Sequence, residues 1–422
     1  MTAPRHIEPL AGDFDSVVHV PGSKSITNRA LVCAALADGR SVLEGSLWAD
    51  DIEAMVGCLR SLGVEIDVDV SSRRITVVGC RGELPADGAR LDVRLSGTTS
   101  RFIAPVASIG HGRYEIDGGE PMRRRPMGPL IGALRALGTT VTEVGQPGHL
   151  PLVLQADGVD GGRTLLSGDV SSQFLSGVLL AAPCFAKGVE VELTTELVSA
   201  PYVELTRSVM RAFGVETQDL TVAPGRYRSR TFLVEPDAST ASYFFAAAAV
   251  CGGRVRIDGL GLQSGQGDLA FVDVLASMGA TVERTASATT VKGTGTLHGS
   301  TVDLRDFSDM VPTLAVVAAF ADSPTTITGV GFIRGKESDR IDAVVTELKR
   351  CGIDASANDD GMTIYPGTAH GAVIETYDDH RIAMSFSVLG LRVPGIEIAD
   401  PGCVAKTFPE FFDALDRLRG SL

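Results

Sequence analysis

Hydrophobic and polar positions follow one another along this chain in a pattern that recurs six times. Each time, a stretch rich in Ser, Thr or Asp leads into a run of small apolar residues, and these stretches begin at Ser23, Ser96, Ser171, Ser239, Ser308 and Asp378. The period is therefore about 70 residues, which is long enough to hold a whole supersecondary unit rather than a single helix or strand. A repeat of this length predicts the architecture before any single motif is considered.

Two helices and a short strand are expected in each repeat. The first helix is apolar all round, as at 241–251 and 313–321, which predicts burial on every side. The second helix has one apolar stripe, as at 341–348, and a strand such as 252–259 lies between the two helices. Each second helix should end before a glycine that is suited to a left-handed C-terminal cap, and these are Gly63, Gly138, Gly214, Gly279 and Gly352.

Six such repeats nearly fill the 422 residues. The last repeat lacks a strand after its second helix, whereas the strand pattern Val17–Val20 precedes the first repeat and belongs to none. We therefore expect the N-terminal strand to complete the last repeat, so that residues 1–21 and 237–422 form one discontinuous domain and residues 22–236 form a second. Three repeats in each domain give roughly 200 residues, an ordinary domain size. The alternating strands and helices predict an α/β fold.

Composition and charge exclude several classes of partner and location. The chain has 38 Lys and Arg against 52 Asp and Glu, a net charge of −14, which speaks against a nucleic-acid partner. No apolar run reaches the roughly 18 residues of a membrane span, and the first ten residues lack the apolar region of a signal peptide, so we expect a cytoplasmic protein. The seven cysteines have no metal-ligand spacing and fall mostly in apolar helices, which predicts buried free thiols in a reducing compartment.

Basic residues gather at the repeat starts despite the acidic background. Lys24 and Arg29 flank hydroxyl groups at the first start, and His380 and Arg381 open the last. Free N–H groups at a helix N-terminus favour an anion, although plain capping explains Ser, Thr and Asp there equally well. Lys and Arg oppose the helix dipole, so capping does not account for them. Several such starts together favour anion binding.

Charged residues also occur in three segments between the repeat starts. Arg123–Arg125 form a run of three arginines, for which an exposed, solvated charge run is the alternative interpretation. Lys336, Glu337 and Arg340 are expected on one face of a helix, either as ligands or as an ion-pair cluster. Lys406 lies just before the second helix of the last repeat.

Five motifs, in this order, resemble the enolpyruvyl transferase family, and within it the 5-enolpyruvylshikimate-3-phosphate synthases. They are PGSKSITNRA at 21–30, GDVSSQF at 168–174, RGKESDRI at 334–341, DDHRIAMSF at 378–386 and AKTFPEFF at 405–412. The resemblance extends from end to end of the chain. Two positions depart from it, because Leu95 and Phe332 stand where the family commonly has Asn.

The resemblance implies a fold and a reaction. The implied fold is two globular domains, each of three βαβαββ units with buried parallel helices and the sheets outside, an inside-out α/β barrel with the active site in the cleft between domains. The implied reaction transfers the enolpyruvyl group of phosphoenolpyruvate to the 5-hydroxyl of shikimate 3-phosphate and releases phosphate. It belongs to the shikimate pathway to chorismate and aromatic amino acids and is the target of glyphosate, a herbicide that competes with phosphoenolpyruvate. The expected partners are these two small molecules, with no metal or other cofactor, no nucleic acid and no membrane, and we expect a monomer.

The resemblance also assigns substrate-binding residues. Those implied for shikimate 3-phosphate are Lys24, Ser25, Arg29, Ser171, Ser172, Gln173, Ser199, Tyr202, Asp309 and Lys336. Those implied for phosphoenolpyruvate are Lys24, Gly97, Arg125, Gln173, Arg340, Arg381 and Lys406.

Catalytic roles are implied for Lys24, Asp309, Glu337 and His380. Addition to a C=C bond needs one proton delivered to the methylene carbon and one removed from the attacking hydroxyl. Asp309 and Glu337 are the expected acid–base pair, because unlike surroundings can push the pKa values of two carboxyl groups apart. We expect Asp309 at the hydroxyl and Glu337 at the methylene. His380 is either a third participant or a cap at the helix start.

Three other functions are possible for a chain with these repeats, and this sequence disfavours each of them. The UDP-N-acetylglucosamine enolpyruvyl transferases share the fold, but they carry a reactive Cys in the loop equivalent to 118–127, which has no Cys here, and an Asn in place of Ser25. The RNA 3′-phosphate cyclases share the repeat unit but require a nucleotide site and a catalytic His. A non-enzymatic repeat scaffold would not require charged residues from several repeats to converge.

Overall fold

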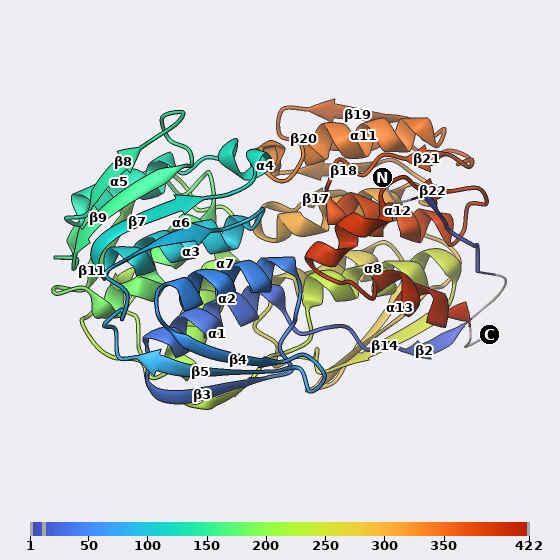
Figure 1. The fold of residues 1–422 in the computed structure, drawn as a ribbon. Coiled ribbons are helices and arrows are strands. Elements are labelled where there is room, and N and C mark those ends of the chain that lie inside the picture. Colours follow the sequence, from blue (N-terminus) through green and yellow to red (C-terminus); the bar gives the residue numbers. More distant parts are fainter. Residues whose placement is uncertain (1–2, 11–13, 420–422) are drawn as a thin grey trace. The chain divides into compact units, whose positions relative to one another are not determined.

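The structure, a computed structural model, describes residues 3–10 and 14–419; residues 1–2, 11–13 and 420–422 lie outside the described part. It divides into two compact domains, each with its own hydrophobic core. The contiguous domain is Gly22–Glu235, and the split domain joins Met1–Pro21 to Pro236–Leu422. In Figure 1 the contiguous domain runs from blue to green, and the split domain from yellow-green to red with the blue N-terminal segment.

Short strands form three sheets in each domain, counted over the described residues. The strands of the contiguous domain are β3 (Asp38–Glu44), β4 (Glu65–Asp69), β5 (Arg74–Cys80), β6 (Gly88–Asp92), β7 (His111–Asp117), β8 (Thr140–Glu143), β9 (Leu152–Asp157), β10 (Gly162–Leu166), β11 (Val189–Leu193), β12 (Thr221–Val222) and β13 (Thr231–Leu233). Those of the split domain are β1 (Arg5–His6), β2 (Asp15–Val17), β14 (Arg254–Asp258), β15 (Thr281–Arg284), β16 (Ala288–Lys292), β17 (Thr301–Asp303), β18 (Thr325–Thr328), β19 (Ala355–Asn358), β20 (Gly361–Ile364), β21 (Val373–Ile374) and β22 (Glu397–Ile398).

Each repeat contributes two helices of the kinds that the sequence predicts. The first helices are α1 (Lys24–Leu36), α3 (Gly97–Ser108), α6 (Ser172–Ala181), α8 (Ala238–Cys251), α10 (Val311–Ala318) and α12 (His380–Gly390). The second helices are α2 (Asp50–Ser61), α5 (Gly128–Ala136), α7 (Ala200–Ala212), α9 (Phe271–Ser277), α11 (Arg340–Arg350) and α13 (Phe411–Arg417). Shorter helical segments are α4 (Glu120–Arg123), η1 (Ala182–Cys184), η2 (Gly267–Ala270), η3 (Arg305–Met310), η4 (Gly331–Gly335) and η5 (Pro401–Lys406).

The fifth repeat shows the repeating unit most completely. Its elements follow in the order β17, α10, β18, α11, β19, β20, and its sheet has the order β17-β18-β20-β19. The first two strands pair in parallel because a helix connects them, and the others pair antiparallel. The second repeat has the same order in its sheet, β6-β7-β9-β8. The predicted α/β fold of βαβαββ units is confirmed.

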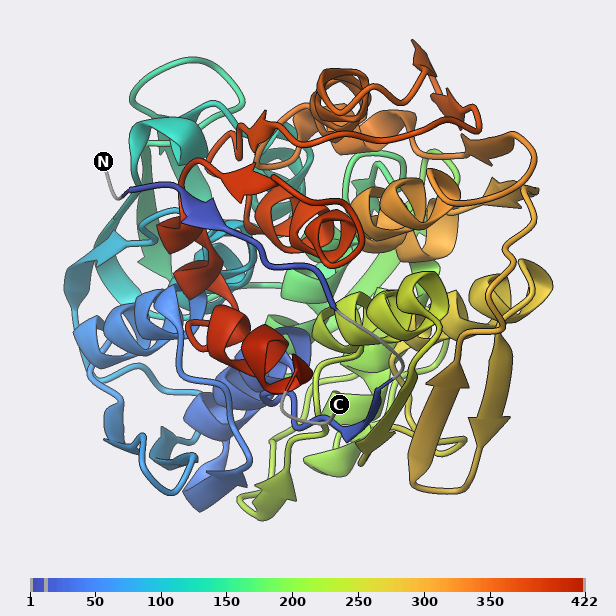
Figure 2. The same cartoon turned by 90° about the vertical axis from the view of Figure 1, so that its right-hand side faces the viewer.

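The first helices form the interior of each domain. α10 and α12 are buried along their whole length, and α1 is buried from Ile26 to Leu36, as their apolar sequences predict. α10 packs on α8 and α12, and Figure 2 shows these helices inside the split domain with its strands toward the edge. α10 ends at Ala318 rather than at Ala321, because Ala321 pairs with Leu297 in a bridge. No helix in the described part of the chain is long and apolar enough to cross a membrane.

The second helices end as predicted, at glycines in the left-handed conformation. Gly63 has a φ of 90° and Gly279 a φ of 116°, and the equivalent glycines of three other repeats are also positive. A residue with a Cβ atom rarely adopts this conformation, so the glycine spacing in the sequence reports the helix ends.

The N-terminal segment forms two strands, and they join different repeats. β1 pairs antiparallel with β22, in the sheet of the last repeat, whereas β2 pairs in parallel with β14, in the sheet of the fourth. The N-terminal segment therefore joins the sheet of the last repeat through β1, whereas the strand expected at Val17–Val20 corresponds to β2, which joins the fourth repeat instead. In the contiguous domain β13 pairs in parallel with β3 and supplies the missing first strand of the first repeat. In each domain a strand distant in the sequence thus completes its first repeat.

Candidate active site

Charged side chains from three helix starts meet in the split domain. Asp309 lies in η3 just before α10, Arg340 is the first residue of α11, and Arg381 is the second residue of α12. Arg340 Nη1 donates to Asp309 Oδ1 at 2.9 Å, and Arg381 Nη2 donates to Asp309 Oδ2 at 2.6 Å. The N-termini of α10, α11 and α12 therefore lie at the same end of the domain. We call these residues, with Glu337, Asp379 and Lys406, the split-domain group.

The guanidinium of Arg340 is the centre of this group. Its side chain is only 2% exposed, and it donates through Nε to Asp379 Oδ2 and through Nη2 to Glu337 Oε2, both at 2.8 Å. Burial acts to lower the pKa of Arg340, but the charges of Asp379, Glu337 and Asp309 outweigh burial and raise it. Glu337 also lies 3.1 Å from Lys406 Nζ through Oε1. Three carboxylates thus surround one buried cation, and two further cations flank them.

Asp309 is a carboxylate at neutral pH. Burial acts to raise its pKa, but the positive charges of Arg381, Arg340 and Lys336 hold the pKa well below its usual range. In this state Asp309 holds no proton, so it can accept one but cannot donate one.

The sequence predicts Lys336, Glu337 and Arg340 on one face of a helix. This prediction is wrong, because Lys336 and Glu337 are not part of the helix. They precede α11, whose cap is Asp339, with Oδ1 accepting from the backbone N–H groups of Ile341 and Asp342 at 3.2 and 3.1 Å. The helix begins where this cap satisfies its first donors, so Glu337 reaches Arg340 from the preceding loop. The Lys336 ammonium lies 5.6 Å from the centre of the Phe332 ring.

His380 is not the cap of α12. Asp379 is, because its Oδ1 accepts from the backbone N–H of Arg381 at 3.0 Å, and His380 is the first helical residue. The cap alternative for His380 is therefore wrong. Its ring is 1% exposed, with Nδ1 3.8 Å from Asp379 Oδ1.

Asp379 was not among the expected site residues, although it lies within a matching motif. Its side chain is fully buried and accepts from Arg340 and from Ser338 Oγ, the latter at 3.0 Å. It joins the start of α12 to the start of α11. The sequence signal was present as an Asp at a repeat start, but capping explained it without a partner.

Lys24 begins α1 in the contiguous domain and is held by a carboxylate that the sequence did not indicate. Lys24 Nζ lies 3.1 Å from Asp51 Oδ2, and the two side chains are 14% and 4% exposed. Asp51 is in the first turn of α2, where an acidic residue also suits the helix dipole. A second named set of residues lies in this domain. We call Lys24, Asp51, Gly97, Arg101, Arg125 and Gln173 the contiguous-domain group.

Gly97 lies between two guanidinium groups. A Cβ atom here would come within 2.6 Å of Arg125 Nη1 and 2.7 Å of Arg101 Nη1. Arg101 donates to the carbonyl of Gly97 and to the carbonyl of Pro126, each at 3.0 Å, and so ties the start of α3 to the arginine-rich loop. Arg101 was not expected in the site. An arginine at the start of an otherwise apolar helix was the signal that could have identified it.

The expected phosphate ligands lie at two neighbouring helix starts. Ser171 is the cap of α6 and Ser172 its first residue, whereas Ser199 precedes α7 in a left-handed conformation with φ 55°. The backbone N–H of Val198 donates to the carbonyl of Gly168 at 3.0 Å, which holds the loops before α6 and α7 together. Two sets of helix N-terminal N–H groups therefore lie close to one another.

Gln173 links the starts of two first helices. It lies in the first turn of α6, and its Nε2 donates to Thr98 Oγ1, in the first turn of α3, at 3.2 Å. The N-termini of α3 and α6 thus lie at one end of the contiguous domain, as those of α10, α11 and α12 do in the split domain.

Arg29 is buried in the contiguous domain, with 2% of its surface exposed. It donates through Nε to Thr206 Oγ1 at 2.7 Å and through Nη1 and Nη2 to the carbonyls of Ser25 and Tyr202, each at 3.0 Å. Its guanidinium also lies 5.2 Å from the Phe102 ring centre. Burial lowers the pKa of Arg29 to about 10, so it keeps its charge at neutral pH.

No site residue is expected at the start of the fourth repeat. Side chains of the protein bind the backbone N–H groups of this helix start. Asp237 Oδ1 accepts from the backbone N–H of Thr240 at 2.7 Å, and Gln266 Oε1 accepts from that of Ala238 at 3.1 Å. Ser239 donates to the buried carboxylate of Asp268. The N–H groups that would attract an anion are used within the protein at this helix.

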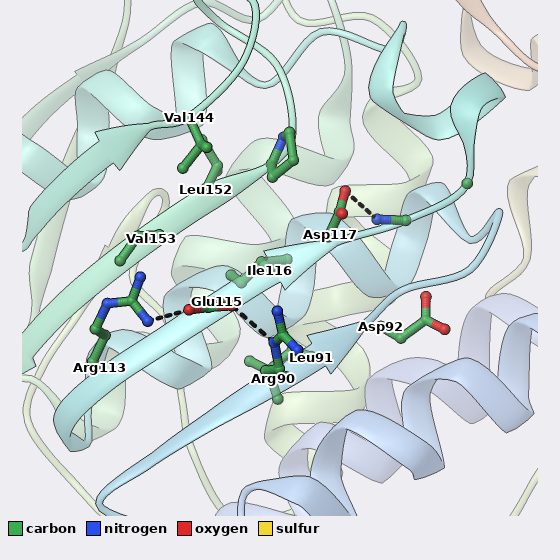
Figure 3. Close-up of a pocket in the computed structure, with 13 residues that line it drawn as sticks. Arg90, Leu91, Asp92, Arg113, Glu115, Ile116, Asp117, Val144, Leu152 and Val153 are labelled. Atoms are coloured by element: carbon green, nitrogen blue, oxygen red, sulfur yellow. Dashed lines mark hydrogen bonds and ion pairs between the residues drawn. The ribbon is translucent and has the colours of Figure 1, made fainter.

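A separate cavity of about 560 Å³ lies on the sheet of the second repeat and contains no expected site residue. Figure 3 shows Glu115 there between Arg90 and Arg113, and it accepts hydrogen bonds from both. Asp117, at the end of β7, accepts from the Arg123 guanidinium at 2.7 Å. Glu115 therefore pairs with two arginines of this cavity, and Asp117 anchors the start of the arginine-rich loop.

The described part of the chain offers neither a reactive thiol nor a group of metal ligands among its Cys, His, Asp and Glu residues. All seven cysteines are free, and burial raises the pKa of the Cys403 thiol to about 12, so it is not a thiolate at neutral pH. Among the described residues no three His, Cys, Asp or Glu side chains are grouped to hold a metal ion.

Known proteins resemble this chain over nearly its whole length. Residues 10–415 match the family model of EPSP synthase (3-phosphoshikimate 1-carboxyvinyltransferase). The 3-phosphoshikimate 1-carboxyvinyltransferase of Nostoc punctiforme is 47% identical over 412 residues, 96% of this chain and 97% of the relative. That of Trichormus variabilis is 45% identical over 420 residues, 98% and 99% of the two chains. The solved structure of EPSP synthase from Acinetobacter baumannii matches at a TM-score of 0.83 with 30% identity, covering 99% and 98%.

Proposed function

The chain belongs to the EPSP synthase family, and we propose that its contiguous-domain and split-domain groups together transfer the enolpyruvyl group of phosphoenolpyruvate to the 5-hydroxyl of shikimate 3-phosphate, with release of phosphate. It is therefore an enzyme, an enolpyruvyl transferase. The observation that supports these residue roles most strongly is the split-domain group itself, where Asp309 and Glu337 are both bound to Arg340. Two carboxylates held among cations meet the need of this reaction for proton transfer beside anionic substrates.

Phosphoenolpyruvate binds to cations of both groups in this proposal. Arginine presents a planar fork that matches carboxylate and phosphate oxygens, and lysine supplies a point charge. Arg381 and Lys406 each hold one carboxylate of the protein now, at 2.6 and 3.1 Å, so they are already oriented for an anion. The proposed ligands are Lys24, Gly97, Arg125, Gln173, Arg340, Arg381 and Lys406.

Shikimate 3-phosphate is held mainly by the contiguous domain. Its phosphate would bind at the paired starts of α6 and α7, where Ser171, Ser172 and Ser199 add hydroxyl groups to the backbone N–H groups of the first helical turns. Ser25 and Arg29 would hold its carboxylate, Gln173 and Tyr202 would lie along its ring, and Lys24 would contribute charge. From the split domain, Asp309 and Lys336 would reach its hydroxyl groups.

Asp309 is the proposed base and Glu337 the proposed acid. As the 5-oxygen bonds to C2 of phosphoenolpyruvate, Asp309 takes the hydroxyl proton and Glu337, in its protonated form, delivers a proton to the methylene carbon. The tetrahedral product then loses phosphate and a proton from the new methyl group, which restores the double bond. Because the pKa of Asp309 is lowered, this residue is ionised at neutral pH and has no proton to donate, so of the two roles only acceptance of a proton is open to it in this state. Lys24 would stabilise the developing charge, and His380 remains a third candidate for proton transfer.

Substitution of the two carboxylates tests these roles. We expect Asp309→Asn and Glu337→Gln each to lower kcat by about 100- to 10,000-fold, since this is the usual contribution of a general acid or base. Asp306→Asn is the matched control, because Asp306 is an exposed carboxylate in the same η3 segment. Phosphate release with shikimate 3-phosphate and phosphoenolpyruvate is measured for each. A variant of Asp309 or Glu337 that keeps more than half of the wild-type kcat would show that its residue does not transfer a proton.

The cellular setting follows from the substrates. Both are small, soluble anions, so we propose that the protein works in the cytoplasm without nucleic-acid or membrane partners. We also propose that it is a monomer. Gel filtration with light scattering tests the monomer, and a stable dimer at micromolar concentration would contradict it.

A further inference from the structure

Glu347 is a buried carboxylate that none of the roles above uses. It lies near the end of α11 and has no exposed surface. An ionised carboxylate in such a place needs several hydrogen-bond donors. Glu347 has them in Tyr377 Oη at 2.7 Å, the backbone N–H of Glu375 at 3.1 Å and Arg350 Nε at 2.9 Å. Two of these three donors belong to the segment just before α12.

That segment contains a backbone turn that is unfavourable by itself. The backbone N–H of Asp379 donates to the carbonyl of Thr376 at 2.8 Å, and the two residues between them, Tyr377 and Asp378, both have φ 55°. Glycine and asparagine are the usual residues in this conformation, because a Cβ atom is crowded there. Two successive side-chain-bearing residues keep it only where their surroundings hold them.

α11 holds the turn at two points. Arg340 and Glu347 are seven residues apart on this helix, two turns, and so lie on one face. Arg340 binds Asp379 through Nε, on the far side of the turn, while Glu347 binds Glu375 and Tyr377 on the near side and at its tip. Burial and the neighbouring Glu347 raise the pKa of Tyr377 to about 12, so its hydroxyl keeps the proton that it donates.

We propose that Glu347 is a positioning residue for the phosphoenolpyruvate site, and that it acts through the turn 376–379. The turn leads directly into Asp379, which orients Arg340, and into Arg381, which follows two residues later. Holding the turn at both ends sets the direction of both arginines before an anion arrives. The assignment of these arginines to phosphoenolpyruvate rests on the proposed function.

Removal of one hydroxyl tests this role with little disturbance of the fold. Tyr377→Phe deletes the bond to Glu347 at a residue that is 42% exposed, and Glu347→Gln keeps the shape but loses the charge. We expect each to raise KM for phosphoenolpyruvate about tenfold, the effect of one hydrogen bond to a charged group, with KM for shikimate 3-phosphate within twofold of wild type. The double variant should raise KM for phosphoenolpyruvate about as much as the more severe single variant does, because both substitutions remove the same contact.

Tyr114→Phe is the matched control. Its hydroxyl donates to the carbonyl of Ala86 at 2.6 Å in the contiguous domain, so this variant also loses one buried hydrogen bond. It should lower the unfolding temperature and leave both KM values unchanged. Tyr377→Phe with a lowered unfolding temperature but unchanged KM values would overturn the proposal, as would an equal rise of both KM values.

Amide hydrogen exchange separates this proposal from the proposed function. In Tyr377→Phe the backbone N–H groups of 379–381 should exchange at least about tenfold faster than in wild type, since they lose local protection, while those of α8 keep their rates. Unchanged exchange at 379–381 would overturn the positioning role whatever the substrate. A wild-type protein that is inactive with both substrates, together with faster exchange in the variant, would instead contradict the proposed function and leave the turn's support by Glu347 standing.

Discussion

Gly97 lies so close to the guanidinium groups of Arg101 and Arg125 that any side chain would have to displace them. Because both contacts are at the ends of flexible side chains, Gly97→Ala should fold normally. We expect it to raise KM for phosphoenolpyruvate about tenfold or more, the loss of one charge-assisted contact, and to weaken glyphosate inhibition in parallel.

Gly132→Ala is the control for that variant, since a Cβ atom at Gly132 in α5 meets nothing within 4 Å. It should leave KM unchanged. Steady-state kinetics and inhibition curves on both variants measure KM for phosphoenolpyruvate and the strength of glyphosate inhibition. A Gly97→Ala enzyme with wild-type KM and wild-type inhibition would contradict the placement of Arg125 in the phosphoenolpyruvate site.

Asp309 should also make the stability of the protein depend on pH. Its folded pKa is held below its usual range by Arg381, Arg340 and Lys336 against the effect of burial, and an unfolded Asp has a pKa of about 3.9. The stabilisation is therefore fully present above about pH 4 and is lost as the pH falls through the lower, folded pKa.

Unfolding in urea at several pH values measures this effect. Asp309→Asn should be less stable than wild type at pH 7, and the difference in the free energy of unfolding should shrink below about pH 4. Asp306→Asn should show no such difference. A gap between wild type and Asp309→Asn that stays constant down to pH 3 would mean that the charge of Asp309 does not stabilise the fold.

At the residue scale, sequence reasoning identified charged groups but not their partners. In the sequence Asp379 is one residue of a repeat start, whereas its contact with Arg340 joins residues that are 39 positions apart. Asp51 and Glu347 each lie in a second helix, where the pattern places polar residues toward solvent, yet both are buried. Such long-range ion pairs leave no periodic signal, because a single Asp or Glu suffices and its position depends on how the helices pack.

At the scale of elements, the apolar pattern predicted most of the fold correctly. The burial of α10 and α12 and the glycine ends of the second helices follow from local chemistry alone, and the structure has them as expected. The errors fall where a tertiary contact decides the outcome. α11 begins after Glu337 because Asp339 caps it, and β2 joins the fourth repeat through its pairing with β14.

The segment η5 carries Cys403 three residues before Lys406, and it allows a test of thiol chemistry. Burial raises the pKa of Cys403 to about 12, so the thiol is a poor nucleophile at neutral pH. We expect Cys403→Ser to keep more than half of the wild-type kcat, and we expect no cysteine to gain the mass of phosphoenolpyruvate during turnover. A covalent adduct on any cysteine, seen by mass spectrometry, would contradict direct addition of the substrate hydroxyl.

At the scale of the whole molecule, each domain brings the starts of its buried helices to one end and places cations there, although the net charge is −14. The proposed function gives shikimate 3-phosphate ligands in both groups, so its negative charge should offset the repulsion among these cations. We expect saturating shikimate 3-phosphate to reduce the radius of gyration in X-ray scattering and to tighten the binding of glyphosate. Scattering curves that do not change with ligand would count against ligand-driven closure.

Phosphate release by the purified wild-type protein, with phosphoenolpyruvate and one of two acceptors, tests the proposed function most directly. We expect steady phosphate release with shikimate 3-phosphate, at a rate that falls at least about 100-fold in Asp309→Asn, and no release with UDP-N-acetylglucosamine. Release with the sugar nucleotide, or no release with shikimate 3-phosphate, would contradict the proposed function.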